Sequence, residues 1–176
     1  NSPVSESSRG VLASLKAVGL DVSSRDLESY RRFFASQKVE DYVNRVFDIA
    51  NIDSVIMTND PFDDLERPTW DAGKNFDGRF RTALRMDALL MAWPTAVPRL
   101  NDWGYKVSED FSGDTIAEVR RYLTDWITQM DAVYMAVSLP PTFKMPDDSP
   151  RGRLIADCVL PVAEQTGKPF AMMIGV

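Results

Sequence analysis

Polar side chains that could do chemistry follow two short apolar runs of the sequence. Residues 52–58 lead into Asn59-Asp60-Pro61, and residues 80–85 end in Arg85-Met86-Asp87. A carboxylate can exchange protons with a ligand, and an arginine can fork onto a ligand's carboxylate. The chain contains no histidine, the usual acid–base group at neutral pH. Chemistry must therefore rest on carboxylates, Arg, Lys, Tyr or Ser, or on residues outside this chain.

Each of these candidates also has a purely structural interpretation. Asn59 and Asp60 could point into a pocket and bind hydroxyls or a metal, but turn frequencies favour a turn in which they bond their own backbone before Pro61. Arg85 could bind a carboxylate. It could equally form an ion pair with Asp87 or Asp60 that only stiffens the end of the strand. The residues alone leave these alternatives open.

Metal and thiol chemistry find little support in the residue types and spacing. Asp60, Asp63 and Asp64 could supply oxygen ligands, but their spacing fits no EF-hand loop, and a solvated acidic loop is favoured. Cys158 is the one cysteine, which excludes an internal disulfide and a thiolate cluster. It lies on the apolar stripe of a predicted helix, where a small buried side chain is expected.

Three helices are predicted before the first strand. Ser5 can cap the first helix, and Gly19 should end it. The second is expected over residues 24–35, with capping-box spacing between Ser23 and Asp26. The third is expected over residues 39–50 because its apolar residues recur at helical spacing. Residues 1–50 are therefore predicted to form a helical lobe.

Residues 51–176 are predicted to alternate between strands and helices. Strands are expected at residues 52–58, 80–85, 132–137 and 170–174. A clear amphipathic helix spans 114–130, a short one is expected near Pro94 and Pro98, and Ser149-Pro150 opens another that Pro161 should kink or end. Apolar strands separated by amphipathic helices indicate a parallel sheet covered on both faces.

The predicted fold class is α/β, as part of a (β/α)8 TIM-type barrel with an N-terminal helical lobe. About four parallel strands cannot close such a barrel, which needs eight strands. We therefore expect the natural protein to extend beyond this sequence at one or both ends. In a barrel of this kind, functional groups lie at the carboxyl ends of the strands.

Composition narrows the classes of function. The chain has 176 residues, 44% of them hydrophobic, and a net charge of −6. An acidic protein is a poor nucleic-acid binder because phosphate recognition needs a positive surface. No apolar run reaches about 18 residues, so no membrane span is predicted, and no signal peptide is recognised. We expect a soluble protein in the reducing cytoplasm.

Several segments, in the same order, resemble the uronate isomerase family. Residues 3–6 and 9–12 look like the opening of that family's helical insertion. Residues 57–61, Met-Thr-Asn-Asp-Pro, are similar to its strand ending in Thr-Asp-Asp-Pro. Residues 85–87 fall where the family has Arg-Pro-Asp, and residues 168–176 look like its strand ending in Leu-His-Ile-Gly-Ala. Each patch is short, and their shared order carries the resemblance.

The resemblance implies an amidohydrolase-type barrel that interconverts aldo- and keto-uronates, such as D-glucuronate and D-fructuronate, in carbohydrate catabolism. Asp60 and Asp87 would be catalytic, while Thr58, Asn59 and Arg85 would bind the sugar acid. No metal ligand is expected within this chain. A divalent metal such as Zn²⁺ would be held by residues outside it. A homo-oligomer is also expected.

The chain departs from the family pattern at two strand ends. Met173 stands where the family has a histidine before Ile-Gly, and Ser138-Leu139-Pro140 stands where it has Ser-Asp-His. Methionine cannot shuttle a proton and is a poor ligand for hard metals. Two alternatives therefore stay open: an amidohydrolase-fold hydrolase or lyase with altered chemistry, and a non-catalytic relative that binds sugar acids or serves in an oligomer.

Overall fold

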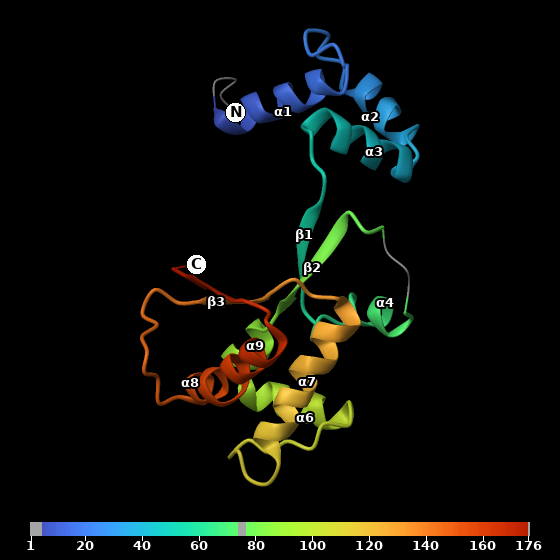
Figure 1. Ribbon diagram of the computed structural model, residues 1–176. Coiled ribbons are helices and arrows are strands. Elements are labelled where there is room, and N and C mark those ends of the chain that lie inside the picture. Colours follow the sequence, from blue (N-terminus) through green and yellow to red (C-terminus); the bar gives the residue numbers. More distant parts are fainter. Residues whose placement is uncertain (1–4, 74–76, 176) are drawn as a thin grey trace. The chain divides into compact units, whose positions relative to one another are not determined.

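The computed structural model describes residues 5–73 and 77–175, and it forms two compact units, Asn1–Asp53 and Ser54–Val176 (Figure 1). The first unit is helical. The second contains a four-stranded parallel sheet and helices. The chain is therefore a mixed α/β protein, as predicted. No helix within the described ranges is long and apolar enough to cross a membrane.

The first unit consists of α1 (Glu6–Ala17), α2 (Leu27–Ala35) and α3 (Val39–Ala50). Ser5 caps α1 as predicted, because its Oγ accepts a hydrogen bond from the backbone N–H of Ser8 at 3.2 Å. The predicted start of α2 was wrong. Asp26 is itself the N-cap and accepts from the N–H groups of Glu28 and Ser29. A carboxylate that accepts two such bonds is a sufficient cap on its own, so the helix begins after it.

The second unit is built on strands β1 (Val55–Asn59), β2 (Phe80–Arg85), β3 (Met135–Leu139) and β4 (Phe170–Ile174), which pair in parallel in the order β1-β2-β3-β4. β2 and β4 have the predicted bounds. The predicted bounds of β1 and β3 were wrong: both strands begin three residues later than predicted. They also extend one and two residues past their predicted ends, because the backbone ladder continues to the pairs Asn59↔Leu84 and Leu139↔Ile174. Polar residues expected after these strands, such as Asn59 and Ser138, therefore lie within them.

Helices connect the strands. They are α4 (Arg67–Asp71), α5 (Asp87–Met91), α6 (Trp93–Asp102), α7 (Thr115–Met130), α8 (Pro150–Leu154) and α9 (Leu160–Thr166), with the π-helical turn η1 (Ile155–Val159) between the last two. The irregular stretch predicted to hold one short helix holds two, α5 and α6. Pro161 does not end the last helix. It lies in the first turn of α9, next to the wider π turn, where a missing N–H is tolerated.

The two faces of the sheet differ in their side chains. Leu84, Met135 and Leu139 are fully buried in a core shared with α7 and with Cys158 of η1, which is buried as expected. Side chains alternate between the two faces along a strand. The opposite face therefore carries Thr58, Ala83, Arg85, Ala136, Ser138, Ala171 and Met173. Alanines and polar residues make up most of this set, and Ala83 and Ala136 are buried within it.

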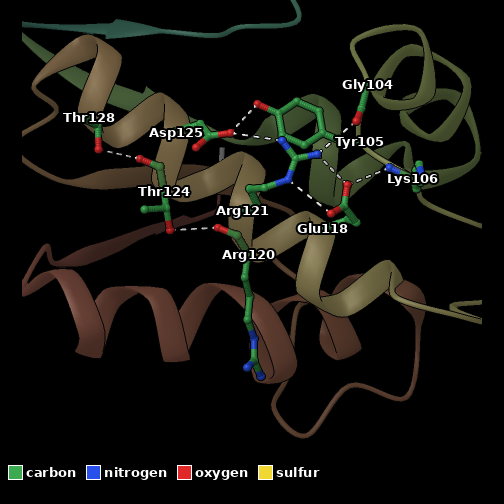
Figure 2. A network of polar contacts seen from close by, with 9 residues as sticks. All are labelled: Gly104, Tyr105, Lys106, Glu118, Arg120, Arg121, Thr124, Asp125 and Thr128. Atoms are coloured by element: carbon green, nitrogen blue, oxygen red, sulfur yellow. Dashed lines mark hydrogen bonds and ion pairs between the residues drawn. The ribbon is translucent and has the colours of Figure 1, made fainter.

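A polar network on α7 holds the connection from α6 (Figure 2). Arg121 donates through Nη2 to Glu118 at 2.6 Å and to the backbone carbonyl of Gly104 at 3.0 Å. Tyr105 donates its hydroxyl to Asp125 at 3.0 Å, and burial, with the nearby Asp125, raises the pKa of Tyr105 to about 12. The phenol therefore stays protonated at neutral pH and keeps donating, which fixes this connection against the long helix.

A close approach between α8 and the loop before it yields a test of this packing. A Cβ atom on Gly152 would overlap the backbone carbonyl of Asp147. We expect Gly152→Ala to destabilise the fold by about 1–3 kcal/mol, the usual cost of overpacking. Thermal unfolding of the full-length protein that carries this chain measures the change.

Gly10→Ala is the matched control, because open space surrounds that position in α1. Alanine in a helix is favoured over glycine by about 0.5–1 kcal/mol, so the control is expected to be neutral or stabilising. Equal melting temperatures for the two variants would contradict the close approach.

Candidate functional site

The parallel register brings the candidate residues into one row at the carboxyl ends of the strands. Asn59 of β1 pairs with Leu84 of β2. The residues that follow them, Asp60 and Arg85, therefore lie beside each other. Arg85 in turn pairs with Ala136, two residues before Ser138, which pairs with Met173. Residues that are far apart in sequence thus meet at one edge of the sheet.

Arg85 and Asp87 form a bidentate ion pair at this edge. Arg85 donates from Nε to Asp87 Oδ2 at 2.7 Å and from Nη2 to Asp87 Oδ1 at 2.9 Å. Both side chains are about two-thirds buried, with 33% and 26% of their surface exposed. The ion pair considered from the sequence is therefore present. The pair uses the side of the guanidinium formed by Nε and Nη2. Nη1 has no hydrogen bond to any described residue.

Ser138 of β3 contacts both partners of this pair. Its backbone N–H donates to Asp87 Oδ1 at 3.1 Å, and its Oγ accepts from Arg85 Nη2 at 2.9 Å. Burial by itself would raise the pKa of Asp87, but the hydrogen bonds from Arg85 and Ser138 outweigh it and lower that pKa below its ordinary value. Asp87 is therefore ionised at neutral pH.

Asp60 has the opposite electrostatic character. Its Oδ1 accepts from the backbone N–H of Phe62 at 2.9 Å, so the turn expected from the sequence is confirmed for this residue. Burial raises the pKa of Asp60 to about 6, and the negative charge of Asp87 adds to the effect, while the N–H of Phe62 and the charge of Arg85 oppose it. Two neighbouring carboxylates with separated pKa values are typical of acid–base sites.

Thr58 and Asn59 lie on opposite faces of β1. Thr58 is exposed on the face that carries Arg85, whereas Asn59 is 9% exposed and shares the helix-covered face with Leu84. Asn59 Nδ2 donates to Glu66 Oε2 at 2.9 Å. Its buried Oδ1 has no hydrogen-bond partner within the described part of the chain. Asn59 therefore holds the loop after β1 and does not stand in the row with Arg85.

Two residues of this site had no distinct signal in the sequence. Glu66 follows Asn59 by seven residues in a loop, and Ser138 belongs to a segment that differs from the motif of the uronate isomerases. Both act through hydrogen bonds that depend on tertiary packing, so residue type and spacing did not identify them.

The three aspartates considered for a metal do not gather into one site. Asp63 accepts from the backbone N–H groups of Leu65 and Glu66, and Asp64 pairs with Arg99. Across residues 5–73 and 77–175, no group of three or more Asp, Glu, His or Cys side chains could hold a metal ion. The carboxylates after β1 therefore shape a loop.

Comparison with known proteins adds two similar structures. No family model matches the chain, and no curated protein matches it. The crystal structure of a uronate isomerase from Bacillus halodurans is similar with a TM-score of 0.96 and 56% sequence identity over 99% of this chain. This chain spans 42% of the length of that protein.

A glucuronate isomerase from Caulobacter crescentus is similar in fold alone. Its TM-score is 0.50, with 17% identity over 74% of this chain and 32% of its own length. Of the motifs that carry the resemblance, Pro3, Val4 and Val176 lie outside the described residues. The motifs at residues 57–61 and 85–87 lie at the carboxyl ends of β1 and β2.

The raised pKa of Asp60 predicts a pH-dependent stability. A carboxyl group whose pKa is higher in the folded state favours folding while it is protonated. This contribution is complete below its ordinary value of 3.8 and is lost as the pH rises through about 6. We expect Asp60→Asn to be more stable than the wild type by about 1–3 kcal/mol near pH ~7.5, and by much less near pH ~4. Urea unfolding of the full-length protein at both pH values tests this.

Asp110→Asn is the control with the opposite sign. Hydrogen bonds from Ser108 and Ser112 lower the pKa of this exposed carboxyl to about 2. Its removal should therefore cost stability at neutral pH and less as the pH falls. A stability difference between Asp60→Asn and the wild type that does not change with pH would contradict the raised pKa.

Proposed function

We propose that this chain, whose resemblance to a segment of the uronate isomerases is confirmed over 99% of its length, is part of an enzyme that interconverts aldo- and keto-uronates. The 56% identity to a uronate isomerase carries the proposal. The proposed substrate pair is D-glucuronate and D-fructuronate. Within that enzyme, the four parallel strands would form part of a (β/α)8 barrel of the amidohydrolase type, with the row of polar residues at its mouth.

The arrangement of the two aspartates supports this chemistry. Aldose–ketose isomerisation moves a proton between adjacent carbons and another between their oxygens, without net oxidation. A proton carrier works best with a pKa near the working pH. Asp60, with a pKa of about 6, meets that requirement. Asp87 is held as a carboxylate by Arg85 and Ser138, and we assign it the role of orienting Arg85 and a substrate hydroxyl.

Arg85 is the proposed contact to the acid group of the sugar. Its Nε and Nη2 are occupied by Asp87 and Ser138, so Nη1 is the donor left for a substrate carboxylate. Thr58 is exposed on the same face and can offer its hydroxyl to the sugar. Asn59 contributes indirectly in this proposal, because its bond to Glu66 holds the loop that carries Asp60.

A divalent metal such as Zn²⁺ would take its ligands from residues outside this chain, since the described residues bring no three ligand side chains together. When bound near the row of strand ends, such an ion would polarise the sugar's carbonyl or hydroxyl oxygen. The sugar acid is the proposed small-molecule partner. We also propose a cytoplasmic homo-oligomer.

Met173 favours one second candidate, a relative that binds sugar acids without converting them. This residue is 38% exposed and lies in register with Ser138, at the position where the family has a histidine. A methionine cannot carry a proton. Catalysis in the leading proposal therefore rests on Asp60, whereas the second candidate needs only Arg85 and its neighbours.

Turnover of D-glucuronate by the full-length protein distinguishes these functions. The protein is loaded with Zn²⁺ or Mn²⁺, its metal content is measured, and formation of the ketose is followed by proton NMR. We expect a keto-uronate product. Bound metal with sugar-acid binding but no ketose would support the non-catalytic candidate and overturn the isomerase.

Replacement of Arg85 tests the binding role. We expect Arg85→Ala to weaken sugar-acid binding by about 1.5–3 kcal/mol, the scale of a hydrogen bond to a charged group. Titration calorimetry with D-glucuronate measures this change. Arg9→Ala is a matched control, because Arg9 forms an exposed ion pair with Glu6 in α1. Equal affinity of both variants and the wild type would place Arg85 outside the substrate site.

A further inference from the structure

We propose that Ser138 is a positioning residue of this site, which holds the Arg85–Asp87 pair in one orientation and so directs Nη1 of Arg85 toward the sugar acid. The inference rests on the proposed function and adds a residue to it. Ser138 comes from β3, whereas Arg85 and Asp87 come from β2 and the start of α5. The positioning contact therefore crosses between neighbouring strands.

The contacts of Ser138 close a ring around the ion pair. Arg85 Nη2 donates both to Asp87 Oδ1 at 2.9 Å and to Ser138 Oγ at 2.9 Å. Asp87 Oδ1 also accepts from the Ser138 N–H at 3.1 Å. Both protons of Nη2 are thereby engaged, one on each side of the nitrogen. Rotation of the guanidinium would break at least one of these bonds, so the ring fixes its orientation.

The backbone explains why Asp87 reaches Ser138. In the parallel ladder, Leu84 N–H donates to Tyr134 and Met86 N–H donates to Ala136. The next bond of this pattern would run from the Ser138 N–H to the carbonyl of Met86. That carbonyl instead accepts from Leu90 in the first turn of α5.

The carboxylate of Asp87 replaces this missing acceptor. A buried N–H left without an acceptor would cost free energy. The helix α5 can therefore begin directly after β2 because Asp87 supplies the acceptor that Ser138 would otherwise lose.

The ring also determines how a carboxylate can approach Arg85. The side formed by Nε and Nη2, which carboxylates usually bind with two parallel bonds, is filled by Asp87. Ser138 takes the remaining proton of Nη2. A sugar acid is therefore bound through the protons of Nη1, without the two parallel bonds that Nε and Nη2 would give. Because the guanidinium is held in one orientation, the carboxylate of the sugar must lie where Nη1 points. The site therefore selects sugars by the position of their acid group.

Removal of the Ser138 hydroxyl tests this role in the full-length enzyme. In Ser138→Ala, the backbone bond to Asp87 remains, and the contacts of Oγ, including the bond that it accepts from Arg85 Nη2, are lost. We expect KM for D-glucuronate to rise about 2- to 13-fold, the equivalent of one ordinary hydrogen bond, with kcat changed less than KM. Because the serine side chain helps to lower the pKa of Asp87, the loss of kcat/KM caused by protonation of Asp87, on the acid side of the limb set by Asp60, should begin at higher pH.

Two further variants separate positioning from packing. Ser138→Thr keeps the hydroxyl and suits a strand, so it should restore both KM and the pH profile. Ser138→Cys keeps the size of the side chain but offers a weak acceptor, so it should behave like Ser138→Ala. Melting temperatures of all three variants are measured alongside.

The outcomes identify which proposal fails. A wild-type enzyme that converts D-glucuronate, together with Ser138→Ala at unchanged KM and pH profile, would overturn the positioning role alone. Failure of Ser138→Thr to restore KM at an unchanged melting temperature would overturn it as well. A wild type that neither binds nor converts D-glucuronate would overturn the proposed function and this inference together.

Discussion

The ion pair between Arg85 and Asp87 is the interaction on which the proposed site depends. It forms where β2 ends and α5 begins, and Ser138 of the neighbouring strand contacts both partners. A bidentate pair that is two-thirds buried is stiffer than an exposed one, because fewer water molecules compete for its hydrogen bonds. The pair thus sets the direction of the free guanidinium nitrogen and keeps Asp87 ionised. Both properties follow from one set of hydrogen bonds.

The contrast between two neighbouring carboxylates gives the site its chemical character. Asp87 has strong donors, and its pKa is lowered. Asp60 is more deeply buried and has weaker donors, so its pKa rises to about 6. The negative charge of Asp87 contributes to that rise. The hydrogen bonds that keep Asp87 charged therefore also help to raise the pKa of Asp60 toward neutral pH. The proposed roles, Asp87 as the orienting group and Asp60 as the proton carrier, depend on this difference in pKa.

The two faces of the sheet carry different side chains. Helices cover one face, where Leu84, Met135 and Leu139 are fully buried. The other face carries Ala83 and Ala136 between the polar residues. The same alternation turns Asn59 away from Arg85 and into contact with Glu66, so adjacent residues of one motif act on opposite sides of the sheet.

The sequence by itself determined the order of the strands and of the longer helices, and the bounds of β2, β4 and α3, because apolar periodicity and capping residues act locally. It also placed Asp60, Arg85 and Asp87 near strand ends. It also contained the motifs whose relationship to the uronate isomerases is confirmed by the similar structure. The Arg85–Asp87 ion pair was one of the alternatives that the sequence left open, because the two residues are close along the chain. Only the tertiary structure decided that Ser138 joins this pair, because its contacts depend on the register between β2 and β3, which lie far apart in the chain. The pKa of Asp60 was likewise a tertiary property, since burial, which no local pattern reports, is its main cause.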